Sequence, residues 1–140
     1  MDKELLEKKK RLQNTKNILK ELAGLEIISI EEISLNELVA MDLRRNKMIP
    51  DSKIGFSDDI SAIVNWIEKN VPFKEGSDFY FVVSTHCVKA RIANSEEAYS
   101  SIWAKMRRAI FLSDSKKTMY EFGCDSRDEY NYLFDKYDLE

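Results

Sequence analysis

The chain has 140 residues, of which 44% are hydrophobic and 34% are charged, and its formal net charge is −3 at pH 7. Such a chain can bury a core as one domain, but its apolar runs are far shorter than the roughly 20 residues of a membrane-spanning helix. Cys87 and Cys124 lack Cys-x-x-Cys spacing and no signal peptide precedes them, so we expect free thiols and a cytoplasmic location.

The N-terminal part of the chain predicts a charged helix followed by a strand. A helix is expected over residues 2–23, where leucines recur at heptad spacing and Gly24 follows. The first half of this helix is mostly charged, so residues 1–23 could project from the domain. The isoleucine-rich segment 25–33 is typical of a strand.

Two more helices are predicted in the first half of the chain. Ser34 and Glu37 have the spacing of a capping box, and a helix is expected to run from there to about Asn46. Residues 48–55 contain proline, aspartate, serine and glycine, a composition that indicates a loop. Ser57 is expected to cap a third helix, which the next proline ends.

The middle of the chain predicts strands and one helix. Residues 79–92 are the most β-like segment, and they are too long for one ordinary strand, so we expect a turn near residues 84–86. Asn94 is expected to cap the helix that follows. Residues 110–112 and 118–122 then predict a hairpin with a five-residue loop.

The C-terminal segment is acidic and rich in aromatic residues, and its spacing predicts a helix after Ser126. Four side chains recur at i, i+3, i+4 and i+7 and are expected to face the core: Tyr130, Leu133, Phe134 and Tyr137. The opposite helix face would then carry Asp128, Tyr132 and Asp135. Carboxylates around a tyrosine would suit a cationic protein surface, although such a face is also typical of an ordinary solvated helix.

These elements together predict an α+β fold. We expect one domain over residues 1–140, with four or five helices packed on a small, mostly antiparallel sheet. The sequence lacks a glycine-rich phosphate loop, a Gly-x-Ser-x-Gly elbow, a His-Glu-x-x-His motif and the Cys/His spacings of zinc sites. We therefore expect no cofactor, no metal and no enzymatic activity.

His86 is the only histidine, so it is the one side chain whose ordinary pKa suits acid–base catalysis near neutral pH. On a strand it would point away from Cys87, so the two could not act as a base and its nucleophile. An enzyme that uses His86 is the third of three functional hypotheses.

A basic cluster supports the second hypothesis, a protein that binds nucleic acid or nucleotide phosphates. The cluster has four cations: Lys89, Arg91, Arg107 and Arg108. Tyr80 and Trp103 could add stacking surfaces. The competing explanation is that the cations complement a helix end and protect a strand edge, and the acidic net charge favours it.

The leading hypothesis is a small acidic protein-binding module, an inhibitor or immunity-type protein that occludes a basic partner, including one that processes nucleic acid. Its general make-up is similar to that of small bacterial immunity proteins and phage-encoded inhibitors, which are short, acidic and free of catalytic motifs. The predicted contact residues are Asp128, Tyr132 and Asp135, and no membrane is involved. The sequence leaves the oligomeric state open.

Overall fold

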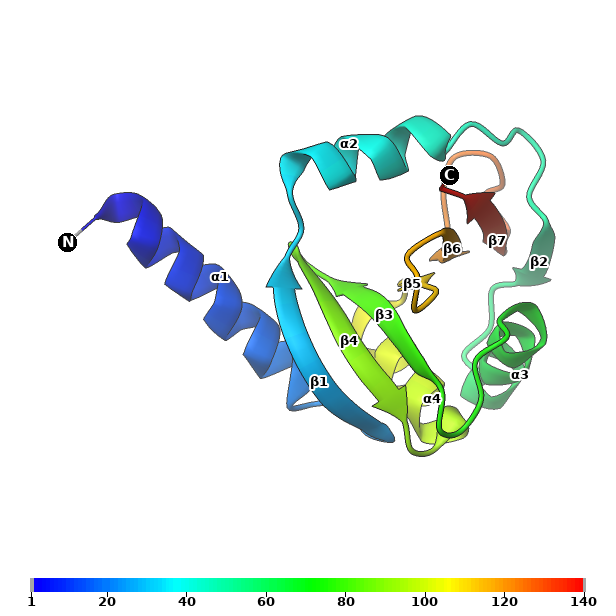
Figure 1. Ribbon diagram of the computed structural model, residues 1–140. Helices are drawn as coiled ribbons and strands as arrows, with labels where there is room; N and C mark the ends of the chain where they lie inside the picture. The colour runs from blue at the N-terminus through cyan, green and yellow to red at the C-terminus, as the bar shows by residue number, and fades with distance from the viewer. Residues whose placement is uncertain (1, 140) are drawn as a thin grey trace.

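The computed structural model describes residues 2–139, so the two terminal residues of the predicted domain lie outside it. The helices of this part are α1 (Lys3–Leu19), α2 (Leu35–Arg44), α3 (Ile60–Asn70) and α4 (Ser95–Met106). The strands are β1 (Leu25–Glu32), β2 (Ser52–Gly55), β3 (Asp78–Val83), β4 (His86–Ile92), β5 (Ala109–Leu112), β6 (Thr118–Gly123) and β7 (Asn131–Asp138). The α+β class is thus confirmed (Figure 1).

All seven strands form one sheet in the order β1-β4-β3-β5-β6-β7-β2, so the sheet is larger than predicted. Every neighbouring pair in the sheet is antiparallel. The first strand in the chain, β1, and the second, β2, therefore lie at opposite edges of the sheet. Surfaces near these two edges are well separated.

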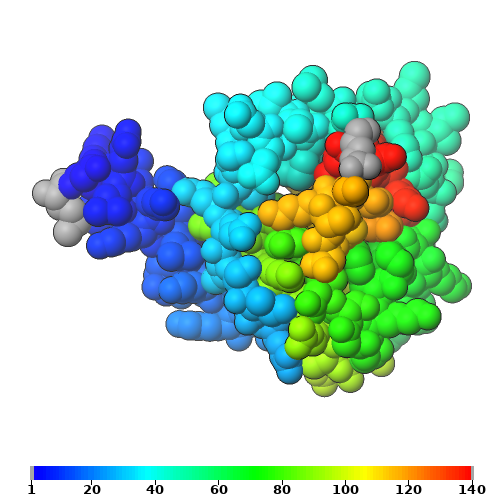
Figure 2. Space-filling view, in the orientation of Figure 1, coloured from blue at the N-terminus to red at the C-terminus, as the bar shows by residue number. Residues whose placement is uncertain are grey.

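The main core lies on the face of the sheet that α3 and α4 cover. Strand residues that alternate along the chain, such as Phe79, Phe81 and Phe111, are buried beneath these helices. The C-terminal half of α1 joins this layer through Ile18 and Leu19. The N-terminal half of α1 is exposed and extends away from the rest of the molecule (Figures 1 and 2).

The opposite face of the sheet is crossed by α2, as Figure 1 shows. Met41 is the one residue that α2 buries, in a smaller cluster with Leu112, Met119 and Tyr137. Further apolar side chains, Val82 among them, are half-buried against this cluster, and charged side chains lie beside it. The two faces therefore differ, because one carries the large core and the other a smaller apolar cluster next to charged groups.

Several local predictions are confirmed. The Ser34 hydroxyl accepts from the backbone N–H of Glu37, and the Glu37 carboxylate accepts from the backbone N–H of Ser34, which completes the capping box at the start of α2. The predicted hairpins form as β3–β4 and β5–β6. Asn94 caps α4 by accepting from the backbone N–H of Glu97.

Two predictions in the first half are corrected. Part of the predicted loop 48–55 forms β2, a four-residue edge strand with a single apolar side chain, so no hydrophobic alternation in the sequence marks it. Asp59 caps α3 in place of Ser57, because its carboxylate reaches the backbone N–H groups of Ser61 and Ala62.

The predicted C-terminal helix is wrong. Residues 131–138 form β7, which pairs with β6 on one side and β2 on the other. An inner strand buries side chains on both faces, so its apolar and polar residues do not alternate regularly. In β7 the apolar residues happen to recur at the spacing of a helix. Aromatic residues also favour strands when neighbouring strands can pack against them.

Candidate functional site

The three predicted contact residues do not share a surface. Tyr132 and Asp135 are three apart on β7, so their side chains point to opposite faces of the sheet. Tyr132 is half-buried against the main core, where its ring packs edge-on to Trp103 at 4.9 Å. Asp135 is 2% exposed on the other face. Asp128 precedes the strand and lies in a loop.

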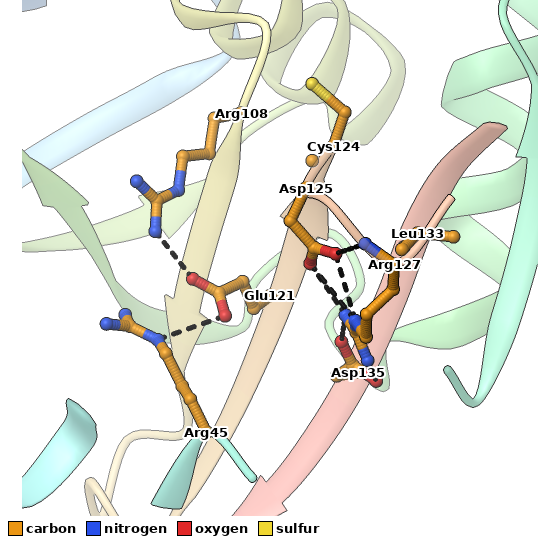
Figure 3. A pocket seen from close by; sticks show the side chains of 9 residues that line it. Arg45, Arg108, Glu121, Cys124, Asp125, Arg127, Leu133 and Asp135 are labelled. Carbon is orange, nitrogen blue, oxygen red and sulfur yellow. Dashed lines mark hydrogen bonds and ion pairs between the residues drawn. The ribbon is translucent and has the colours of Figure 1, made fainter. Parts of the chain in front are cut away.

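Asp135 lines a charged pocket of about 300 Å³ between the end of α2, β6, β7 and the loop that joins these two strands (Figure 3). On one side, Glu121 accepts from Arg45 at 3.1 Å and from Arg108 at 2.8 Å. On the other side, Arg127 donates to Asp125 and to Asp135. Figure 3 shows these two groups facing each other across the pocket.

The charges in this pocket neutralise one another. Each of the three guanidinium groups meets a carboxylate, and Arg127 holds the pKa of Asp125 below its ordinary value, while Asp125 and Asp135 raise the pKa of Arg127. Arg127 also donates to the Lys47 carbonyl at 3.0 Å. The network therefore ties the loop and the end of α2 to the sheet, which explains it without a ligand.

The basic cluster of the second hypothesis is also dispersed. Lys89 pairs with Asp114 at 3.3 Å and Arg91 pairs with Asp78 at 2.8 Å. Lys89 lies beside Tyr80, and Tyr80 beside Leu112, which is four residues along the chain from Arg108. At about 3.3 Å per residue, Lys89 and Arg108 are therefore displaced by roughly 13 Å along the strand direction.

Arg107 and the two proposed stacking residues also do not form a phosphate-binding surface. Arg107 is the C-cap of α4, exposed and in the left-handed conformation with φ 52°. Trp103 is fully buried and cannot stack on a base. The Tyr80 ring already faces the ammonium groups of Lys89, at 5.7 Å, and Lys116, at 4.6 Å. Of the two proposed stacking rings, that of Trp103 is therefore unavailable, and that of Tyr80 is already occupied by two ammonium groups of the chain itself.

His86 lies beneath α1 and is 3% exposed. Its Nδ1 is 2.6 Å from the hydroxyl oxygen of Thr15, which is itself buried. Burial lowers the pKa of the imidazole, so the neutral ring is favoured. The contact of the ring with Thr15 joins β4 to α1, so packing accounts for this histidine.

A surface that the sequence did not reveal lies where β2 and β7 pair at the edge of the sheet. The Tyr130 side chain is 78% exposed and that of Phe56 is 50% exposed. The Phe56 backbone N–H donates to the Tyr130 carbonyl at 3.3 Å, so the two residues are neighbours. Asp58, Asp128 and Glu129 adjoin them in the chain, and we call these five residues the acidic aromatic surface.

Helical spacing had assigned Tyr130 to the core, which is why this surface escaped prediction. The Asp128 carboxylate accepts from the backbone N–H of Tyr130 and from the Asn131 side chain, both at 2.8 Å, and these bonds hold the pKa of Asp128 below its ordinary value. An Asp that bonds the backbone two residues later is typical of a turn. An aspartate two residues before Tyr130 is therefore the feature of the sequence that could have indicated a turn here.

Comparison with family models, with curated proteins and with solved structures found no match in any of the three. Within residues 2–139, no helix is both long enough and apolar enough to span a membrane. The same residues place no three His, Cys, Asp or Glu side chains together where they could hold a metal ion.

Proposed function

We propose that this protein is a protein-binding module of the inhibitor or immunity type, which occludes a basic partner through the acidic aromatic surface. The observation that carries the proposal is the exposure of Tyr130 beside Phe56, with Asp58, Asp128 and Glu129 within two residues of them in the chain. Aromatic residues are enriched at the centres of protein interfaces, where fully burying one such side chain contributes about 1.5 to 3 kcal/mol.

The Phe56 ring and the backbone of Tyr130 are held in place before any partner arrives. Phe56 packs edge-on to Tyr132, with ring centroids 4.7 Å apart, and its backbone bonds to Tyr130. The turn bonds of Asp128 fix the backbone of Tyr130. Ordering this surface on binding would therefore cost little conformational entropy, which favours affinity.

The charge of this surface indicates a basic partner. Asp58 and Glu129 are exposed, and Asp128 is half-buried with Lys53 at 4.0 Å. Among the described residues, ion pairs bring one cation, Lys53, to these three carboxylates, so this surface carries a net negative charge. Such a potential attracts a cationic protein surface and speeds its association. The phosphate-binding and His86 hypotheses gain no comparable support, because their residues are paired, dispersed or buried.

The proposal is tested by capture of host proteins on the immobilised protein, followed by mass spectrometry. The double variant Asp58→Lys with Glu129→Lys reverses the charge of the surface without removing the Asp59 cap of α3. A matched control, Glu7→Lys with Glu26→Lys, makes the same change in net charge on α1 and β1, near the opposite edge of the sheet.

We expect wild type and the control to capture the same basic protein and the surface variant to lose it. A captured protein that both variants retain equally would contradict the assignment to this surface. Capture of nucleic acid in place of protein would contradict the function itself.

A further inference from the structure

The open edge of β2 lies beside the acidic aromatic surface. β2 is the last strand of the sheet, pairs only with β7, and runs directly into Phe56. Figure 1 shows it at the margin of the molecule. An edge strand directs half of its backbone N–H and C=O groups away from the sheet, where another strand can pair with them.

The hydrogen bonds to β7 fix which residues of β2 face outward. The Phe56 N–H donates to the Tyr130 carbonyl, and the direction of the backbone groups alternates along an antiparallel strand. Ile54 therefore faces β7, whereas Lys53 and Gly55 face outward. Both outward residues are exposed, and because glycine has no side chain, the exposure of Gly55 is that of its backbone. Within residues 2–139, no hydrogen bond from outside the sheet reaches the backbone of either residue. The edge thus offers two donors and two acceptors.

We propose that the basic partner binds here through an extended segment, which adds to the sheet as a strand beside β2 and carries lysine or arginine next to the acidic aromatic surface. This inference rests on the proposed function and names the form in which the partner is recognised. An extended strand is the structure whose backbone complements the donors and acceptors of a sheet edge. The added strand would form its backbone bonds whatever its side chains, so the charges beside β2 would select a basic segment.

The carboxylates at this edge are available to such a segment. Asp58 follows the end of β2 by three residues, and Glu129 precedes Tyr130. Among the described residues, neither side chain forms an ion pair or a hydrogen bond. Lys53 adds a cation at the edge, but its ammonium is 4.0 Å from Asp128, so that carboxylate offsets its charge. Lysine or arginine at this end of the segment would therefore meet two unpaired carboxylates.

The other edge strand, β1, is less suited to this role. Its pairing with β4 is interrupted by a bulge between Ile27 and Ser29, and a bulge at an edge hinders the addition of a further strand. Two carboxylates of β1, those of Glu31 and Glu32, already pair with cations of the chain itself. A basic segment therefore finds both an open backbone and unpaired carboxylates at β2.

The first test is amide hydrogen exchange of the whole chain, read by NMR, with a capped peptide of alternating lysine and valine as the probe. This peptide is basic, and its valines favour an extended strand. At saturation we expect the exchange of the Lys53 and Gly55 amides to slow by at least roughly tenfold. The Ile54 amide already faces β7, so it is the internal control and should change less. No binding at millimolar peptide, or a bound peptide that leaves both outward amides unprotected, would overturn the proposal.

A pair of variants then separates the backbone contact from the charge. Lys53→Pro and Lys53→Ala both remove the ammonium, but only proline removes the outward N–H, which the pairing of β2 with β7 does not use. We expect Lys53→Pro to bind the peptide at least roughly fivefold more weakly than Lys53→Ala, the loss that one backbone hydrogen bond brings. Equal affinities of the two folded variants would overturn the added strand. If the proline variant does not fold, the exchange test on wild type decides.

Neither test uses the captured host protein, so the two proposals can fail separately. A host protein that is lost by Asp58→Lys with Glu129→Lys, together with unprotected edge amides, would overturn the added strand and support the proposed function. Protected edge amides with no host protein captured would support a peptide-binding edge and contradict the inhibitor function.

Discussion

Arg127 donates to Asp135 through two nitrogen atoms, at 2.5 and 3.3 Å, and so supplies a cation to a carboxylate that is 2% exposed. Removing one partner of such a pair leaves the other charge buried without compensation. We expect Arg127→Met to lower the free energy of unfolding by about 3 kcal/mol, measured by urea denaturation.

The control for this prediction is Arg107→Met, which removes an exposed guanidinium and should change the free energy of unfolding by less than about 0.5 kcal/mol. Combining Arg127→Met with Asp135→Leu should restore part of the lost stability, because no charge is then left unpaired. Equal stabilities of the two single methionine variants would mean that the ion pair does not hold the loop.

Gly24 and Gly76 both adopt positive φ, at 74° and 86°, but their surroundings differ. A Cβ at Gly24 would lie 2.5 Å from the Asn94 carbonyl oxygen, whereas a Cβ at Gly76 would meet nothing within 4 Å. We expect Gly76→Ala to cost about 1 kcal/mol from backbone strain alone and Gly24→Ala to cost well above that. Thermal unfolding of both variants checks the order, and the reverse order would contradict the close approach of Gly24 to the start of α4.

The buried His86 predicts how stability depends on pH. Burial lowers its pKa in the folded protein, Glu32 opposes this shift, and Arg11 adds to it. The unfolded chain therefore takes up a proton first as the pH falls below about 6.5. This contribution to stability is present above that pH and is lost as the pH falls toward the lowered pKa.

The measurement is the free energy of unfolding at a series of pH values between about 7 and 5, for wild type and for His86→Phe. Wild type should lose stability across this interval, and the variant should show a smaller slope. Carboxylates that do not interact with the imidazole contribute equally to both proteins, so the difference reports the imidazole together with its interaction with Glu32. A variant with the wild-type slope would place the pH dependence elsewhere.

The two thiols should differ in reactivity. Cys124 is exposed, whereas Cys87 is buried and its pKa is raised to about 11 by desolvation. We expect iodoacetamide to modify Cys124 in the folded protein and Cys87 only after unfolding, as read by peptide mass mapping. Cys124→Ser should then remain unmodified in the native state. Rapid native labelling of Cys87 would contradict the contact of α2 with the sheet, because Cys87 lies in the cluster that Met41 covers.

Local signals were sufficient to predict much of this fold. The capping box of Ser34 and Glu37, the turn near residues 84–86 and the β5–β6 hairpin each depend on residues close in sequence. The structure reproduces all three because nothing distant competes with those bonds.

The acidic aromatic surface could not be predicted in the same way, because it depends on the pairing of β2 with β7, two segments far apart in the sequence. β2 has only one apolar side chain, so its sequence shows no hydrophobic period, and the apolar spacing from Tyr130 to Tyr137 fits a helix as well as an inner strand. The choice between these two periods decides whether Tyr130 faces the core or the solvent. Only the pairing of the strands settles that choice.

The affinity of Tyr130→Ala for the captured basic protein, measured by titration calorimetry beside wild type, tests the central claim most directly. An exposed tyrosine at the centre of an interface should contribute about 2 kcal/mol, so the dissociation constant should rise roughly 30-fold while the unfolding temperature stays near that of wild type. An unchanged dissociation constant would show that the partner binds elsewhere and would contradict the account.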